Sequence, residues 1–194
     1  MSNAGSSRFS RPPAPERVLE IASELFYAEG INTVGVDRIA AEADASKATL
    51  YAHFGSKDGL VAAYLDRRSA RSREDLIEHL ESDGDARQKL LRIFDALVDW
   101  YEEDDFRGCH FIIAGSELTA PDHPAVEVGR RHRAWVKGHF EGLATELGAA
   151  DPALLGAQFL MLYDGATVAA DLDGYPEAAR AARDAAERLI DSLG

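Results

Sequence analysis

Apolar residues in the first part of the chain recur at the spacing of α-helices. One predicted helical face is built from positions i, i+3, i+4, i+7 and i+8, which are Val18, Ile21, Ala22, Leu25 and Phe26. Pro15 suits the first turn of this helix, because its missing N–H would have no partner there in any case. Gly30 suits the stop, because glycine adopts left-handed backbone conformations freely.

Two short helices separated by a tight turn are predicted next. The first carries an apolar stripe formed by Val36, Ile39, Ala40 and Ala43. Asp44 and Ala45 interrupt the pattern, and Ser46 can cap a second helix through its hydroxyl. Leu50 and Phe54 are an inward pair, which leaves an outer face of Lys47, Ala48, Thr49, Tyr51 and His53. Such a face suits the phosphates and base edges of DNA.

Two further positions extend this polar face. Thr33 precedes the first helix of the pair, where it can cap that helix or contact phosphate. Ser56 opens another helix, so Lys57 falls in a first turn beside free backbone N–H groups. That end of a helix attracts phosphate.

The rest of the chain keeps helical periodicity, with no strand alternation and no internal repeat. Predicted helices run over about residues 56–80, 86–101, 110–118, 124–147, 151–172 and 176–193, with breaks rich in Gly, Pro and Asp. With the three helices before them, this predicts an all-α fold of about nine helices.

The segment from Glu16 to Leu65 resembles the DNA-binding domain of the tetracycline-repressor (TetR) family of bacterial transcription regulators. The resemblance rests on the first helix with Phe26 and Gly30, the run RIA at 38–40, SKATLY at 46–51 and SK at 56–57. The sequence departs from the family pattern at the turn, where Asp44 stands at a common Gly position and Ala45 replaces a larger hydrophobic residue. Asp tolerates the left-handed conformation, so we expect the turn to survive.

The resemblance implies two domains after an N-terminal segment. Residues 1–13 are expected to be a disordered arm or expression-tag remnant, because Ser2-Asn3-Ala4 looks like a tag scar. Arg8 and Arg11 could follow a minor groove as an arm. Residues 14–58 form the helix-turn-helix domain, and residues 59–194 form a ligand-binding and dimerisation domain. The expected DNA-binding residues are Thr33, Ser46, Lys47, Ala48, Thr49, Tyr51, His53 and Lys57.

The charge distribution fits this division. The chain has 194 residues, 46% of them hydrophobic, which is enough for a sizeable core beyond one helix-turn-helix unit. Its net charge is −13, but residues 1–73 carry 10 Lys and Arg against 9 Asp and Glu, whereas residues 74–194 carry 11 against 25. The acidic excess lies outside the predicted DNA-binding domain, so the second domain is not expected to touch DNA.

Composition also indicates a cytoplasmic protein. A single cysteine rules out an internal disulfide and agrees with a reducing compartment. No signal peptide is found, and no apolar run is expected to reach the roughly 20 residues of a membrane span. No cofactor, metal ion or membrane partner is expected; the expected partners are an operator duplex, a small effector and a second copy of the chain.

The last two predicted helices are the candidates for a dimer surface. They carry more apolar and small residues than one core stripe needs, and in the family the corresponding helices form a four-helix bundle with their twofold mates. The expected interface residues are Leu155, Phe159, Leu162, Ala166, Ala182, Ala186 and Leu189. The alternative is that these faces close a core within one chain.

The middle helices are the candidates for an effector pocket, which the family places there. The expected lining consists of Phe94, Leu97, Trp100, Phe106, Cys109, His110, Phe111, Trp135, Phe140 and Tyr163. Polar anchors are expected among Cys109, His110, Glu117, His132 and His139. The aromatic lining predicts a small hydrophobic effector, an aromatic or acyl-chain compound.

The sequence therefore predicts a ligand-responsive transcriptional regulator, a repressor that binds a palindromic operator as a homodimer and is released by its effector. By the family's mechanism, the effector moves the helix that begins near Ser56 and changes the spacing of the two recognition helices.

Three other functions remain as alternatives for this sequence. A redox sensor could use Cys109 as an exposed thiol of low pKa. A metal site could draw on His110, His123, His132, His139 and Glu117, but His-x-x-His and His-x-x-x-His spacings are absent. An all-helical enzyme could pair Cys109 with His110, but adjacent helical residues point about 100° apart.

Overall fold

The computed structural model describes residues 11–81, 83–175 and 177–193. Within these residues the chain forms nine α-helices and no strand, which confirms the all-α prediction. The helices are α1 (Ala14–Glu29), α2 (Val36–Glu42), α3 (Lys47–Phe54), α4 (Lys57–Glu81), α5 (Ala86–Tyr101), α6 (His110–Glu117), α7 (Pro124–Glu146), α8 (Pro152–Leu172) and α9 (Ala178–Asp191).

Local chemistry accounts for most helix ends. Asp85 begins α5 with a capping box, because its carboxylate accepts from the backbone N–H of Gln88 while the Gln88 side chain accepts from the Asp85 N–H. Gly30 has φ 92° directly after α1, a conformation that costs glycine little. The expected start of the last helix at Pro176 lies outside the described residues, and α9 begins at Ala178.

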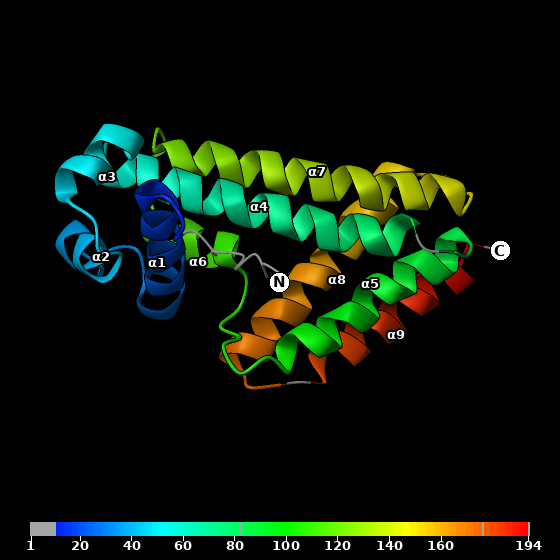
Figure 1. The fold of residues 1–194 in the computed structure, drawn as a ribbon. Coiled ribbons are helices and arrows are strands. Elements are labelled where there is room, and N and C mark those ends of the chain that lie inside the picture. The colour runs from blue at the N-terminus through cyan, green and yellow to red at the C-terminus, as the bar shows by residue number, and fades with distance from the viewer. Residues whose placement is uncertain (1–10, 82, 176, 194) are drawn as a thin grey trace, which may run out of the picture.

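Helices α1, α2 and α3 form a head at one end of the molecule, and α4 and α7 run side by side away from it (Figure 1). Helices α5, α8 and α9 complete a helical body beyond the head. Two groups of buried apolar residues follow this division. The head core is centred on Val18, Phe26, Ile39 and Leu50, and the body core on Phe94, Phe140 and Phe159.

Helix α4 belongs to both parts of the molecule. Its residues Leu60, Val61 and Tyr64 are buried in the head core, together with Ala114 of α6 and Val128 of α7. Its later residue Leu76 packs against the body core. A domain boundary at residue 58, as expected from the sequence, separates α1, α2 and α3 from the later helices. The head core crosses this boundary, because α4, α6 and α7 also contribute residues to it.

The expected dimer residues on α8 and α9 mostly face the core of their own chain. Leu155, Phe159, Ala166, Ala182 and Ala186 are buried, and Leu162 and Leu189 are half-buried. Phe159 has no exposed surface, and its ring centroid lies 6.3 Å from that of Phe140 on α7. The expectation that these five buried residues face a partner is wrong, because their side chains pack in the core of their own chain.

A different face of α8 carries exposed apolar side chains. Leu154 is 56% exposed, Met161 63%, Val168 38% and Leu172 76%, and Gly165 between them is also exposed. These residues recur at i, i+7, i+11, i+14 and i+18, which places them along one side of the helix. We call them the α8 stripe.

The composition of α8 also corrects the expectation about membrane-like segments. Among the described helices, α8 alone is long and apolar enough to cross a membrane, with a mean hydropathy of 1.3. One third of its most apolar window is buried in the chain's own core, and it carries Asp164, which pairs with Arg133 of α7. Burial on one side and the α8 stripe on the other account for this apolar composition.

Candidate DNA-binding surface and ligand cavity

Helix α3 presents the polar face that the sequence predicts. Ser46 caps it, because its hydroxyl oxygen accepts a hydrogen bond of 3.0 Å from the backbone N–H of Thr49. Leu50 has no exposed surface, and Tyr51 on the other side is 44% exposed. The remaining exposed residues of this face are Lys47, Ala48 and His53. Helix α3 is thus anchored by one apolar side chain and leaves its polar side open.

The turn before α3 is held by two arginines. Asp44 has φ 47°, the left-handed conformation that the sequence requires at this position. The guanidinium of Arg17 donates to the carbonyl oxygens of Ala43 at 2.9 Å and Asp44 at 2.6 Å. Arg11 pairs with the Asp44 carboxylate at 2.6 Å, and Arg8, the other candidate arm residue, lies outside the described residues. Sequence reasoning missed Arg17, because the two carbonyl groups that it holds at the turn are 26 and 27 residues away.

Other candidate contacts flank α3. Lys57 occupies the first turn of α4, half-buried, with its ammonium 6.0 Å from the Phe26 ring centroid. Lys47 forms an ion pair with Asp37 of α2. Thr33 is exposed, but α2 begins after Gly35 with no side-chain cap, so the capping role considered for Thr33 is wrong.

Arg38 fixes α2 to its neighbours. Its guanidinium donates to the carboxylates of Glu29 on α1 and Glu42 on α2, and these hydrogen bonds raise the pKa of Arg38. The same contact lowers the pKa of Glu29. Arg38 therefore orients α2 on α1 and has its charge compensated inside the head.

A cavity of about 420 Å³ lies among α4, α5, α7 and α8. The structure places these expected lining residues on its wall: Leu97, Trp100, Cys109, His110, Phe111, Phe140 and Tyr163. Phe94, Phe106 and Trp135 are not on it. Phe94 is wholly buried against Phe140, Phe106 packs on Trp100 and Tyr101, and Trp135 borders a separate groove with His139.

The cavity is more polar than its aromatic residues suggest. Helix α4 contributes a row at helical spacing, Arg68, Ser72, Asp75 and His79, and the far wall contributes Arg133 and Asp164. The expected lining did not include these residues, because it was based mainly on aromatic positions and α4 has few of them. Their recurrence at i, i+4, i+7 and i+11 is the signal that could have found them.

Two histidines in this wall are held neutral by burial. The ring of His110 lies 2.6 Å, Nδ1 to Oη, from Tyr64 and stacks on Tyr27 at 3.8 Å, and burial lowers its pKa to about 3. His132 contacts the hydroxyl of Ser69 at 3.1 Å and stacks on Phe111 at 3.9 Å. Burial lowers the pKa of His132 to about 4. His110 thus connects the cavity with α1 of the head.

The surroundings of Cys109 disfavour redox or nucleophilic chemistry. Burial raises the pKa of the Cys109 thiol, whereas a reactive cysteine needs a stabilised thiolate. The neighbouring His110 is engaged with Tyr64 and Tyr27 instead of the thiol. The described residues also bring together no group of three or more His, Cys, Asp or Glu suited to a metal ion.

Glu117 serves the head and is not on the cavity wall. Its carboxylate accepts from the backbone N–H groups of Ile31 at 3.0 Å and Asn32 at 2.8 Å, in the segment between α1 and α2. The Asn32 side chain donates in turn to the Glu117 carbonyl at 3.1 Å. Its expected role as a ligand anchor is replaced by a clamp between α6 and the head. His139, another expected anchor, lies in the groove beside Trp135, where its Nδ1 is 2.9 Å from the Trp135 carbonyl oxygen.

Comparison with known proteins agrees with this arrangement. Residues 18–64 match the family of bacterial regulatory proteins called tetR. SCO4454, a TetR-family transcriptional regulator from Streptomyces coelicolor, is 35% identical, with a TM-score of 0.86 over 93% of this chain and 95% of that chain. The sav143 protein of Streptomyces avermitilis, a TetR-type transcriptional regulator, is 30% identical, with a TM-score of 0.81 over 91% of this chain and 99% of that chain.

Among curated proteins, the transcriptional activator FasR of Mycolicibacterium smegmatis is 35% identical over 120 residues, which are 60% of this chain and 54% of FasR. The match thus spans about half the length of that relative. SCO4454 is matched almost throughout, with the same N-terminal head and helical body. The chain belongs to the TetR family of bacterial transcriptional regulators, and it is a helix-turn-helix regulator and not an enzyme.

Proposed function

We propose that the protein is a ligand-responsive repressor that binds a palindromic operator as a homodimer in the cytoplasm and is released by a small effector. The observation that carries this proposal is the open polar face of α3, on a helix capped by Ser46 and anchored by Leu50. Thr49, Tyr51 and Lys47 would contact the duplex from this face, and Lys57 would contact a flanking phosphate.

The α8 stripe supports the dimer. Four large side chains of this stripe are at least 38% exposed on one chain, and a contiguous apolar surface of this kind marks an interaction site. A twofold partner would cover it and would place two copies of α3 on successive half-sites. The half-buried Leu162 and Leu189 would lie at the edge of this contact.

The cavity beneath the head supports control by a ligand. His110 lies on its wall and stacks on Tyr27 of α1, whose hydroxyl donates to the Gly108 carbonyl at 3.0 Å. Glu117 holds the segment after α1 from α6, the helix that begins at His110. A ligand that prefers a displaced α6 or α4 would therefore reposition the head, and only such a preference releases DNA.

Selection of duplexes from a random library tests the DNA-binding role. We expect the wild-type protein to enrich a palindromic sequence, and Thr49→Ala to alter preference within each half-site because it removes a base-edge contact. Tyr51→Ala should weaken binding about tenfold with an unchanged melting temperature. Ala181→Ser on exposed α9 is a neutral control. Failure of the folded protein to enrich any sequence would contradict the proposal.

A further inference from the structure

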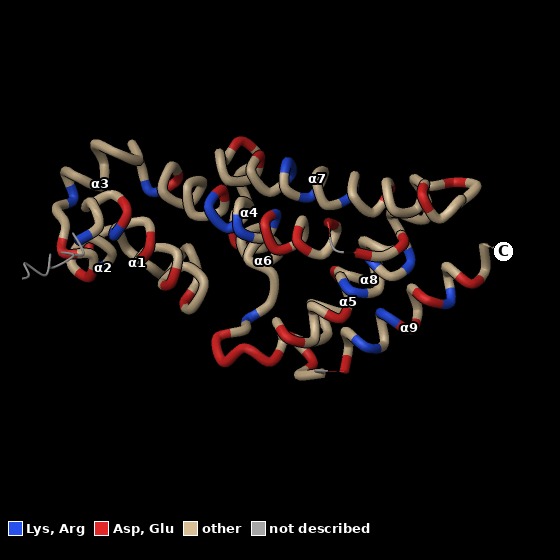
Figure 2. Tube along the Cα trace, turned by 45° about the vertical axis from the view of Figure 1, so that its right-hand side comes forward, with Lys and Arg blue, Asp and Glu red and all other residues tan. Residues whose placement is uncertain are grey.

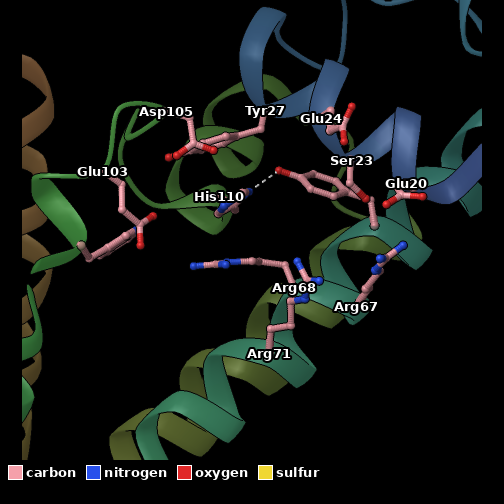
Figure 3. A pocket seen from close by; sticks show the side chains of 12 residues that line it. Glu20, Ser23, Glu24, Tyr27, Arg67, Arg68, Arg71, Glu103, Asp105 and His110 are labelled. Carbon is pink, nitrogen blue, oxygen red and sulfur yellow. Dashed lines mark hydrogen bonds between the residues drawn. The ribbon is translucent and has the colours of Figure 1, made fainter. Parts of the chain in front are cut away.

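A second, smaller cavity of about 210 Å³ lies between α1, α4 and the loop after α5 (Figure 3). Its wall includes Arg67, Arg68 and Arg71 of α4. Arg68 and His110 also border the larger cavity, so the two spaces adjoin. The side chain of Arg68 extends into the space below His110, whereas that of Arg67 points away from His110, toward Glu20.

These three arginines differ from most arginines in the described part of the chain. Arg17, Arg38, Arg87, Arg131, Arg133 and Arg183 donate to carboxylates or carbonyl groups. Arg67 and Arg71 have no ion pair or hydrogen bond with any described residue. Arg68 likewise has no ion pair or hydrogen bond with a described residue, and its guanidinium carbon lies 5.9 Å from the ring centroid of Trp100.

Carboxylates around both cavities leave this positive charge uncompensated. Those of the smaller cavity, Glu20, Glu24, Glu103 and Asp105, are all exposed and stay hydrated. Asp75, Glu78 and Asp99 of the larger cavity are exposed as well. Asp164 is half-buried, but Arg133 neutralises it. Among the described residues that line the two cavities, Arg67 and Arg68 are half-buried cations with no ion pair.

The chemistry of this wall suits an oxyanion. A guanidinium presents donors in a planar fork that matches a carboxylate or sulfonate, and partial burial strengthens such hydrogen bonds. His110 adds a neutral donor, because its Nε2 carries the proton when the Tyr64 hydroxyl donates to Nδ1. Apolar surface begins next to this group, with Leu97, Phe111 and Phe140 in the larger cavity.

We propose that the effector is an amphiphilic organic anion, whose apolar body fills the larger cavity and whose carboxylate or sulfonate lies on Arg68, with Arg67 and Arg71 at the mouth between α1 and α4. This inference rests on the proposed function and narrows the hydrophobic effector expected from the sequence to a charged class. A neutral compound of equal size would leave the arginines unpaired.

Two fluorescent probes of nearly the same shape test the charge requirement. 8-Anilinonaphthalene-1-sulfonate carries a sulfonate, and N-phenyl-1-naphthylamine has the same ring system without it. We expect the wild-type protein to bind the sulfonate at least about tenfold more tightly. Arg68→Gln, and separately Arg67→Gln with Arg71→Gln, should weaken sulfonate binding about tenfold and change binding of the neutral probe less than about twofold.

Two controls locate the effect. Arg130→Gln on the exposed side of α7 removes the same charge away from both cavities and should alter neither affinity. Ala96→Trp fills the larger cavity and should weaken both probes. Melting temperatures of all variants establish that they are folded.

The outcomes separate the two proposals. Equal affinity for both probes, together with unchanged sulfonate binding in both arginine variants, would overturn the anion inference and leave the effector cavity intact. Probe binding that is unaffected by Ala96→Trp would place both probes elsewhere and would contradict the effector cavity itself.

Discussion

Charged residues of the head are largely paired with one another. Arg38 is held by Glu29 and Glu42, Lys47 by Asp37, and Arg17 by three backbone carbonyl groups. Lys57 has no carboxylate partner among the described residues and lies in the first turn of α4. Phosphate binding by the head should therefore depend strongly on Lys57.

Replacement of Lys57 by Ala should weaken operator binding and lower the slope of log affinity against log salt by about one unit. The loss should be similar for all operator sequences, because a phosphate contact carries no base preference. Titrations at several salt concentrations measure the slope, with Lys137→Ala on α7 as the matched control. A slope unchanged from wild type would remove Lys57 from the DNA contact.

Stability should depend on pH through His110 and His132. Burial lowers the pKa of both below the ordinary value, to about 3 and about 4, so the unfolded chain takes up protons that the folded chain excludes. The free energy of unfolding should therefore be highest above about pH 6.5, where both histidines are neutral in the folded and the unfolded chain. It should fall between about pH 6.5 and pH 4, by up to about 1.4 kcal/mol per pH unit for each histidine.

Urea denaturation at pH 7, 6 and 5 measures this dependence. The double variant His110→Gln and His132→Gln should flatten it, whereas His53→Gln on the exposed face of α3 should leave it unchanged. An equally steep loss of stability in the double variant would show that other groups cause it.

Residue-scale features were predictable where the partners are local. The Ser46 cap follows from neighbours in sequence, and the left-handed Asp44 follows from its place at a turn position where the TetR family commonly has Gly. Arg17 at the turn and Glu117 at the segment after α1 were not predictable, because their partners are 26 and 86 residues away. Pairing over such distances is decided by how the helices pack.

At the scale of elements, the order and type of helices follow from hydrophobic periodicity, but the direction of each face does not. Helix α8 is apolar almost all round, so its sequence alone could not tell which leucines face α7 and which form the α8 stripe. The polar row on α4 could have been predicted from its helical spacing. The sequence does not show that Arg67 and Arg71 lack ion pairs, because pairing depends on how the helices pack.

The crossing of α7 and α8 depends on Gly156. A Cβ atom at this position would lie 2.8 Å from the backbone nitrogen of Glu141, which cannot move without shifting α7. Gly156→Ala should therefore lower the free energy of unfolding by about 1–3 kcal/mol. At Gly142 a Cβ meets nothing within 4 Å, so Gly142→Ala should raise it by up to about 1 kcal/mol.

Thermal or urea denaturation of both variants tests the packing of this crossing. The two substitutions add the same methyl group to neighbouring helices, so opposite signs would isolate the close approach as the cause. Equal effects from both would mean that α7 and α8 do not approach closely at Gly156.

At the scale of the whole molecule, the proposed DNA-binding helix α3 lies away from the acidic body. Figure 2 shows acidic residues gathered in the loop after α5 and spread along the body. This loop lies beside α1 at the smaller cavity, whereas α2 and α3 lie on the side of the head away from the body (Figure 1). Helix α4 joins the two, because its first turns pack in the head core and its later turns line both cavities. A ligand among α4, α5 and α7 is thus next to the element that carries the head.

Dimerisation through the α8 stripe would allow two copies of α3 to bind the two half-sites of an operator. Met161→Arg places a charge on the exposed stripe and should leave the chain folded but monomeric. Phe159→Arg places the same charge two residues away in the core and should unfold the chain. The contrast distinguishes a partner surface from intrachain packing.

The most direct test of a dimeric DNA-binding regulator is the stoichiometry of its complex with a selected palindromic duplex, measured by light scattering for wild type and Met161→Arg. We predict that wild-type protomers bind in multiples of two, and that folded Met161→Arg binds at least about 100-fold more weakly, because each half-site then binds alone. Single protomers bound at full affinity, with no loss in Met161→Arg, would contradict the account.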